Sequence, residues 1–232
     1  MQATRTSTGL PPVVSREEWE TARQALLIRE KAHTRAGDAL AAERRRMPMV
    51  EITSDYIFQG EHGPARFVDL FAGKRQLILQ HFMFHPDWDE GCTGCSFEVD
   101  HVPNLAHLHA RDTDYVIVSR APIEKLMAYR DRMGWDVDWY SSYGTSFNDD
   151  FGVTVDDQED QGISSFLRDG DRIFHTYRIG ARGAELLLNT FSMLDLTAFG
   201  RQETWEDSPE GWPQTQPYQW WRRHDRYESD NG

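Results

Sequence analysis

The sequence predicts an α/β domain, and three observations support this fold class. Two apolar runs, Gln76–Phe84 and Tyr115–Ser119, are typical of buried strands. Each is followed by a helical segment, over residues 95–110 and over Ile123–Met133. The first strand leads into its helix through a C-x-x-C motif. Strands that alternate with helices indicate a parallel sheet, because parallel strands need crossover connections.

Capping and breaking residues delimit the predicted helices. Ser15 and Glu18 form a capping box that opens an N-terminal helix within residues 15–48. Pro103 predicts a break in the helix that follows the C-x-x-C motif, because proline cannot continue the helical hydrogen bonding. Residues 1–14 show no such signals, and we expect them to be disordered.

Two predicted β-hairpins flank the strand–helix unit. The first pairs Tyr56–Phe58 with Ala65–Phe71 across a Gly-rich turn. The second pairs Ile163–Leu167 with Arg172–Tyr177 across an Asp-Gly-Asp turn. The intervening residues 135–162 are rich in Trp, Tyr, Ser, Asn and Asp, and predict an ordered loop.

The predicted order of elements is hairpin, β-α-β-α, long loop and β-β-α, with Gly183–Leu196 as the last helix. This is the thioredoxin order with an added N-terminal hairpin, and it predicts a thioredoxin-like domain over residues 50–199. Residues 200–232 contain four tryptophans among prolines and charges. We expect this C-terminal extension to pack on the domain or on a partner subunit, so a homodimer is compatible with the sequence.

Composition and charge exclude several classes of partner. The 232-residue chain has 25 basic and 38 acidic residues and a net charge of −13, which argues against nucleic acid and anionic membranes. No apolar run reaches the roughly 20 residues of a membrane span, and the N-terminus lacks the apolar region of a signal peptide. We therefore expect a cytoplasmic protein, in a compartment where structural disulfides are rare.

Cys92 and Cys95 are the only cysteines of the chain. A C-x-x-C between a strand and a helix is typical of dithiol redox chemistry, because unpaired N–H groups at the helix start stabilise a thiolate on the first cysteine. The alternatives are thiolate ligands for a metal and cysteines with a purely structural role. A structural zinc site would need four ligands, and the chain has no second C-x-x-C.

Longer motifs resemble one bacterial family. They include HFMFHPDWDEGCTGCSFEVD, DYVIVSRAPIEKLMAYRDRMGW, WYSSYGTSFNDDFGV and FLRDGDRIFHTYRIGARGAELL, and cover roughly residues 50–227 together with LDLTAFGRQE and WWRRHDRY. In this order they resemble the thioredoxin-like family of unknown function 899, whose members are described as predicted dithiol-disulfide oxidoreductases. The resemblance implies the fold and a thiol-disulfide oxidoreductase that uses Cys92 as the attacking thiolate and Cys95 as the resolving thiol, without a cofactor.

Two features depart from well-known redox relatives of this fold. Three acidic residues, Asp87, Asp89 and Glu90, precede Cys92. Their charge would raise the pKa of its thiol if they lie close to the sulfur, and would have little effect if they point into water. In thioredoxin-like redox proteins a cis-proline usually faces the C-x-x-C, just before a strand. Here Ile163-Ser164 occupies that place, so the proline is missing. Its absence leaves room for metal at the cysteines.

Copper is therefore the alternative cofactor. Cu(I) favours thiolates, so Cys92 and Cys95 with either His85 or His175 would form a copper site. Such a site would serve oxygen-dependent chemistry on a small molecule, or metal binding without catalysis.

In either case we expect a small-molecule or thiol substrate. Aromatic and polar side chains near the motif are the candidates for a substrate pocket. They are His85, Trp88, Tyr140, Ser142, Tyr143, Asn148 and Ser164.

Overall fold

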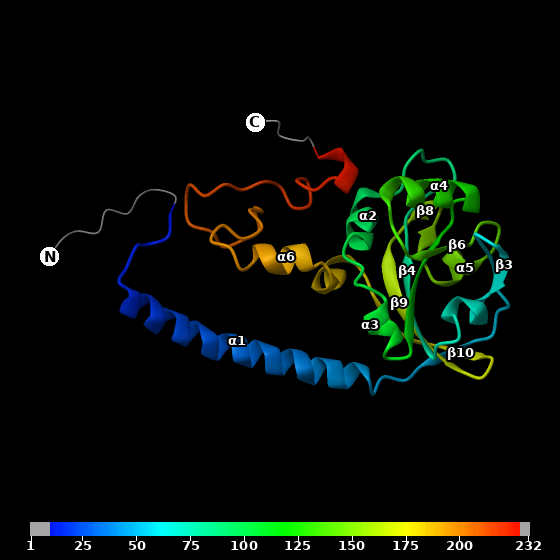
Figure 1. Ribbon diagram of the computed structural model, residues 1–232, viewed down its shortest axis with the longest axis horizontal. Coiled ribbons are helices and arrows are strands. Elements are labelled where there is room, and N and C mark those ends of the chain that lie inside the picture. Colours follow the sequence, from blue (N-terminus) through cyan, green and yellow to red (C-terminus); the bar gives the residue numbers. More distant parts are fainter. Residues whose placement is uncertain (1–9, 228–232) are drawn as a thin grey trace. The chain divides into compact units, whose positions relative to one another are not determined.

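The computed structural model describes residues 10–227 and divides the chain into two compact units (Figure 1). The larger unit comprises residues 49–192 and, within the described part, 218–227. The smaller unit comprises residues up to Pro48 together with Met193–Pro217. Residues 1–9, which hold most of the segment expected to be disordered, lie outside the described residues.

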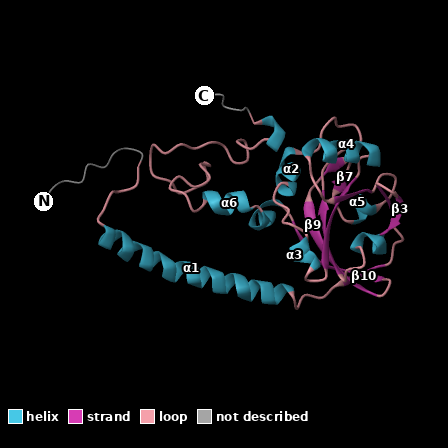
Figure 2. Cartoon of the chain, viewed as in Figure 1, coloured by secondary structure: helices cyan, strands magenta, loops and turns pink. Residues whose placement is uncertain are grey.

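An eight-stranded sheet organises the larger unit (Figure 2), in the order β1-β10-β9-β4-β5-β6-β2-β3. Its strands are β1 (Val50–Ile52), β2 (Ile57–Gly60), β3 (Gly63–Arg66), β4 (Gln76–His81), β5 (Thr113–Ser119), β6 (Asp138–Ser141), β9 (Gly162–Asp169) and β10 (Arg172–Ile179). A separate hairpin joins β7 (Thr154–Val155) to β8 (Gln158–Glu159).

The helical elements of this unit are short. The α-helices are α2 (Thr93–Val99), α3 (Ala106–His109), α4 (Ile123–Met133), α5 (Phe147–Asp150) and α6 (Asn189–Leu194), which ends in the smaller unit. The 3-10 helices are η1 (Phe67–Phe71), η2 (Ala181–Leu187) and η3 (His224–Arg226).

The four central strands define the fold. Strands β4 and β5 are parallel and joined through α2 and α3, whereas β9 is antiparallel to β4 and pairs with β10 in a hairpin. The order β10-β9-β4-β5 is that of the thioredoxin-like fold, which confirms the predicted fold class. The pairing of His81 with Gly162 brings the start of β9 level with the end of β4, where the cysteine loop begins.

Successive side chains of the central strands point to opposite faces of the sheet, and each face is covered by its own hydrophobic core. Val116 and Val118 of β5 face a core that η1 and Phe147 of α5 complete, whereas Tyr115 and Ile117 face the core beneath α2 and α4. Because both faces are buried, these strands are continuous apolar runs. Cys95 belongs to the second core.

Several elements differ from the sequence prediction. The segment expected to be an ordered loop over residues 135–162 contains β6, which is parallel to β5 and pairs with β2. The second strand of the predicted N-terminal hairpin stops at Arg66, and Phe67–Phe71 forms a 3-10 helix that buries three side chains. The expected helix over Gly183–Leu196 is divided into η2 and α6 by the non-helical backbone at Leu188 (φ −93°, ψ 87°).

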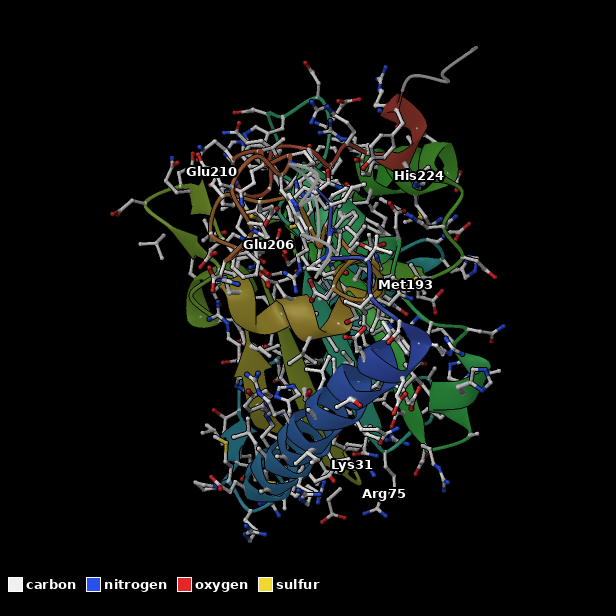
Figure 3. All side chains as sticks on the ribbon, turned by 90° about the vertical axis from the view of Figure 1, so that its left-hand side faces the viewer. Lys31, Arg75, Met193, Glu206, Glu210 and His224 are labelled. Atoms are coloured by element: carbon white, nitrogen blue, oxygen red, sulfur yellow. The ribbon has the colours of Figure 1, made fainter. Side chains whose placement is uncertain are left out.

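The smaller unit contains one long helix, α1 (Arg16–Arg44), which buries none of its side chains. Its predicted capping box is present, since Ser15 Oγ accepts a hydrogen bond from the Glu18 N–H and Glu18 accepts from Ser15. Lys31, labelled in Figure 3, lies on this helix. In Met193–Pro217, Trp205 Nε1 donates to the buried Glu203 carboxylate at 2.6 Å. Over residues 10–227 we find no helix with the length and apolarity of a membrane span.

Candidate active site

Cys92 is held at the start of α2 by a tight loop. It is the N-cap residue of the helix, and its N–H donates to the Met83 carbonyl at 2.9 Å. Gly91 makes the close approach of this loop feasible, because a Cβ there would lie 2.4 Å from the Phe82 ring and 3.0 Å from Tyr129. Only glycine therefore lets the backbone before Cys92 pack this closely against the core.

The surroundings of Cys92 favour its thiolate. The hydrogen bond from the Cys95 thiol is the largest cause that lowers the pKa of Cys92, and the N–H groups of Cys95 and Gly94 add to it. The Arg223 guanidinium lowers it further, and together these groups outweigh burial and bring the pKa of Cys92 to about 6. Cys92 remains partly exposed, so a reactant can reach its sulfur, which is ionised near neutral pH.

Cys95 lies inside the core with 1% of its surface exposed. Its hydrogen bond to Cys92 and its burial raise the pKa of Cys95 well above the ordinary value of a thiol. The two cysteines are therefore unequal, with an ionised outer sulfur and a protonated inner one. This asymmetry is the arrangement that a nucleophilic and a resolving thiol require.

Glu98 lies on the same helix and lines the same pocket as the two cysteines. Burial and the negative charge of Cys92 raise the pKa of Glu98 to about 7, against the effect of a hydrogen bond from Gln80. Gln80 Nε2 donates to Glu98 at 2.9 Å and to the Cys95 carbonyl at 3.1 Å, while Tyr115 OH donates to Gln80 at 2.8 Å. A buried polar chain thus holds an easily protonated carboxyl beside the dithiol.

Residues 218–227, here called the C-terminal segment, pack against α2. Trp220 and Trp221 contact the small core formed by Phe97, Leu188 and Phe191. The Trp221 ring lies 4.6 Å from Phe97 and is stacked on Phe191 at 5.6 Å. His224, labelled in Figure 3, donates a hydrogen bond from Nδ1 to the Asp100 carboxylate at 2.6 Å. Aromatic packing therefore attaches this segment to the helix that carries both cysteines.

Arg223 connects the C-terminal segment to the cysteine loop. Its Nε donates to Tyr129 OH at 2.9 Å, and its Nη2 donates to the Gly91 carbonyl. Tyr129 OH in turn lies 2.9 Å from Ser96 Oγ, which donates to the Cys92 carbonyl at 2.7 Å. The guanidinium is thereby fixed close to the Cys92 sulfur.

Arginines neutralise the nearest of the acidic residues that precede Cys92. Glu90 pairs with Arg132, with Arg223 at 2.9 Å and with Arg226 at 3.0 Å. Hydrogen bonds from Arg132 and Arg226 lower the pKa of Glu90. Arginines distant in sequence therefore surround the Glu90 carboxylate and compensate its charge near Cys92.

A pocket of about 260 Å³ opens at the cysteines, and we call it the cysteine pocket. Helix α2 contributes Cys92, Gly94, Cys95 and Glu98 to its lining. Ala181, Arg182, Glu185 and Leu188 come from η2 and its C-cap, and Gln161 precedes β9. Tyr218 and Trp221 of the C-terminal segment complete it, with their rings stacked at 5.1 Å.

Three of the predicted pocket residues belong to a different polar network. Ser142 Oγ donates to Asn148 at 2.7 Å, and Asn148 donates to Thr154 at 3.2 Å. His85 lies 3.2 Å from Asp157 in the β7–β8 turn. These contacts fasten the long loop at the carboxyl ends of the parallel strands, and none of the three residues lines the cysteine pocket.

The other four predicted residues also lie outside the lining of the cysteine pocket. Ser164 is fully buried and is hydrogen-bonded to His81 Nε2 at 2.8 Å. Gln161, just before β9, lines the cysteine pocket in its place. Tyr140 is on β6, where its ring approaches Gly60. Trp88 and Tyr143 are exposed at the surface.

The histidines of the copper hypothesis have other partners. His175 Nε2 lies 3.0 Å from the Tyr177 carbonyl, and its ring stacks on Phe166 at 5.0 Å. His85 faces Asp157. Within residues 10–227, no group of three or more His, Cys, Asp or Glu side chains is arranged to hold a metal ion.

A family model described as "Bacterial protein of unknown function (DUF899)" matches residues 8–227. The chain belongs to this family. The match spans both cysteines and the C-terminal segment, and it confirms the resemblance inferred from the sequence motifs. None of the curated proteins matches the chain.

Solved structures of two peroxiredoxin-type proteins and of a putative thiol:disulfide interchange protein are similar at low sequence identity. Peroxiredoxin Q of Xanthomonas campestris is 12% identical with a TM-score of 0.48, over 66% of this chain and 98% of that one. Peroxidoxin BcpB of Mycobacterium tuberculosis is 18% identical with a TM-score of 0.46, over 64% and 97%. A putative thiol:disulfide interchange protein DsbE of Chlorobium tepidum is 15% identical with a TM-score of 0.43, over 60% and 90%.

Proposed function

We propose that the protein is a thiol-disulfide oxidoreductase in which Cys92 is the nucleophile and Cys95 the resolving thiol. The observation that carries the proposal is the unequal pair of cysteines at the start of α2. Cys92 is accessible and its pKa is lowered to about 6, whereas Cys95 is buried and its pKa is raised. Structural cysteines need neither property.

The reaction proceeds through two exchanges. The Cys92 thiolate attacks one sulfur of a substrate disulfide, forms a mixed disulfide and releases the first substrate thiolate. Cys95 then attacks the Cys92 sulfur, which closes the Cys92–Cys95 disulfide and releases the second substrate thiolate. The substrate gains two electrons and the dithiol loses two, and an external thiol returns the protein to its reduced form.

Glu98 has the position and the acidity to accept the proton of Cys95. Because the pKa of Glu98 is about 7, its carboxyl can take up and release a proton near neutral pH. Formation of the mixed disulfide removes the negative charge of Cys92. Without that charge the carboxylate form of Glu98 becomes more favourable at the moment when Cys95 must lose its proton.

Trapping of the mixed disulfide tests the proposal. With a chromogenic disulfide, Cys95→Ser should release one equivalent of thiolate and retain the other half of the reagent on Cys92. The wild type should release two equivalents and end with an internal disulfide. Cys92→Ser should show neither outcome near neutral pH. Equal behaviour of the two serine variants would contradict the assigned roles.

Metal analysis of the same variants addresses the copper hypothesis. In our proposal, metal-free protein exchanges at its full rate and needs no copper, whereas added Cu(I) slows exchange because it occupies the two thiolates. About one copper per chain, lost in the double variant and needed for oxygen consumption, would instead favour a copper-thiolate enzyme.

A further inference from the structure

We propose that the substrates are low-molecular-weight disulfides that carry an uncharged aromatic or aliphatic group, and that the cysteine pocket selects them. This inference rests on the proposed function and adds the chemical class of its substrate. It derives from the size of the pocket, from the side chains of its wall and from the charges at its mouth.

The size of the pocket sets an upper limit on the group that enters it. Its volume is about 260 Å³. An apolar cavity of about 150 Å³ takes up benzene. The cysteine pocket therefore has room for one substituted ring or a short alkyl chain next to the sulfur that Cys92 attacks. A folded polypeptide or the whole of a tripeptide disulfide would extend beyond it.

Aromatic and aliphatic side chains form the wall that faces the cysteines. Trp221 lies over Gly94, where an added Cβ would be 3.8 Å from Trp221 Cζ2 and 3.8 Å from Cys92 Sγ. Tyr218 stacks on Trp221, and Leu188 is buried beside them. A ring that entered would contact an aromatic face while its sulfur approached Cys92, an arrangement that gains apolar burial and aromatic contact.

The wall is a fixed part of the larger unit. Trp221 is packed on Phe97 and Phe191, with ring centroids 4.6 Å and 5.6 Å away. Arg223, two residues further along, is hydrogen-bonded to Tyr129 and to the Gly91 carbonyl. The C-terminal segment therefore supplies a preformed binding surface, which lowers the ordering cost of substrate binding.

Charges around the pocket disfavour anionic substrates. Arg182 Nε donates to Glu185 Oε1 at 3.1 Å, and Tyr218 OH donates to the same carboxylate. The guanidinium at the mouth is thus compensated by Glu185 and does not act as an isolated cation. Glu98 adds negative charge as it ionises, and the whole chain carries −13. A carboxylate on the substrate would compete with Glu185 for the one guanidinium of the pocket lining and would be repelled by the ionised Glu98.

The test compares two chromogenic aromatic disulfides of different charge. Dithiodipyridine is uncharged near neutral pH, whereas dithiobis(nitrobenzoate) is a dianion. The rate of each with the reduced protein is divided by its rate with free cysteine, so that the intrinsic reactivity of the reagent cancels. Oxidised glutathione and insulin represent a charged small disulfide and a polypeptide.

We expect the normalised rate for dithiodipyridine to exceed that for the dianion by about tenfold or more, which corresponds to about 1.4 kcal/mol. Trp221→Ala should reduce this preference. Tyr218→Leu should also reduce it, while leaving the packing of Trp221 on Phe97 of α2 largely in place. Trp88→Ala is the control, because Trp88 is an exposed tryptophan outside the pocket. Glu185→Gln should raise the rate of the dianion several-fold.

The outcomes separate the substrate class from the reaction. Equal normalised rates, or a preference for insulin or glutathione, with a normal Cys92–Cys95 disulfide in the product would overturn the substrate class and leave the reaction standing. An unchanged preference in both Trp221→Ala and Tyr218→Leu would overturn the role of the aromatic wall. Product without a Cys92–Cys95 disulfide would overturn the proposed function itself.

Discussion

Replacement of Cys95 by alanine should raise the pKa of Cys92, because it removes the hydrogen bond that lowers this pKa most. The pKa of Cys92 is lowered from 9.0 to about 6, a stabilisation of the thiolate by about 4 kcal/mol in total. The N–H groups of residues 94 and 95 and the Arg223 charge remain in Cys95→Ala, while burial continues to oppose ionisation. We expect a pKa of about 8 or higher, near the usual 8.5 of a thiol.

The rate of exchange at a single pH would hide this change. At pH 7 a rise in pKa from about 6 to about 8.5 lowers the thiolate fraction about 30-fold. The more basic thiolate is about 10- to 20-fold more nucleophilic, given a Brønsted coefficient of about 0.4–0.5. The net loss is only about two- to threefold. The informative quantity is therefore the midpoint of the pH profile.

Ultraviolet absorbance of the thiolate against pH measures that midpoint. Cys95→Ser is the matched variant, because its hydroxyl can still donate to the Cys92 sulfur and should keep the midpoint below that of Cys95→Ala. Cys92→Ser assigns the transition, since it should lack any midpoint near 6. A midpoint near 6 in Cys95→Ala would show that the hydrogen bond from the Cys95 thiol does not activate Cys92.

Three further predictions concern groups around the site and in the core. The pKa of Glu98 in the folded protein is raised to about 7. The stability that protonated Glu98 contributes is therefore complete below about pH 4.5 and is lost as the pH rises through 7. In denaturant titrations above pH 7, Glu98→Gln should be more stable than the wild type by up to about 3 kcal/mol. Arg223→Gln should raise the titration midpoint of Cys92 by less than about one unit, whereas Arg226→Gln, at a residue paired with Glu90, should leave it unchanged. Burial lowers the pKa of His81 to about 3, so stability present above 6.5 is lost as pH falls toward 3, and acid unfolding of His81→Gln should show a weaker pH dependence.

The parts of the fold that the sequence predicted are those with strong local patterns. Strands β4 and β5 are continuous apolar runs because both of their faces are buried. Helix α4 ends at Gly134, which adopts the left-handed conformation that glycine tolerates. The β9–β10 hairpin turns at Asp169-Gly170-Asp171. In each case the local preference and the tertiary environment agree.

Strand β6 could not be recognised in the same way. Its four residues, Asp138–Ser141, alternate between exposed and buried, and the stretch around it is rich in polar residues typical of loops. Its identity as a strand depends on pairing with β5 and β2, which are distant in sequence. Tyr140 of this strand is a predicted pocket residue, but its ring lies against Gly60, and its neighbour Trp139 packs in the core beneath α4.

The candidate site shows the same contrast between local and tertiary information. The spacing of Cys92 and Cys95 is visible in the sequence, and Glu98 could have been added, because a residue three positions after Cys95 lies on the same face of a helix. Trp221 and Arg223 come from the far end of the chain, and no local pattern indicates that they contact α2. The charge that acts on Cys92 is a property of the folded chain, as the pairing of Glu90 with three arginines illustrates.

The most direct test of the proposed dithiol chemistry is an equilibrium titration of the two thiols against a redox buffer, with the mass of the protein measured at each point. We expect the Cys92 and Cys95 thiols to be lost together in one two-electron transition, with the loss of two hydrogens and a potential between about −270 and −120 mV. Both thiols should be fully recovered on reduction. Oxidation of Cys92 alone, or two cysteines that never pair, would show that the protein is not a dithiol oxidoreductase.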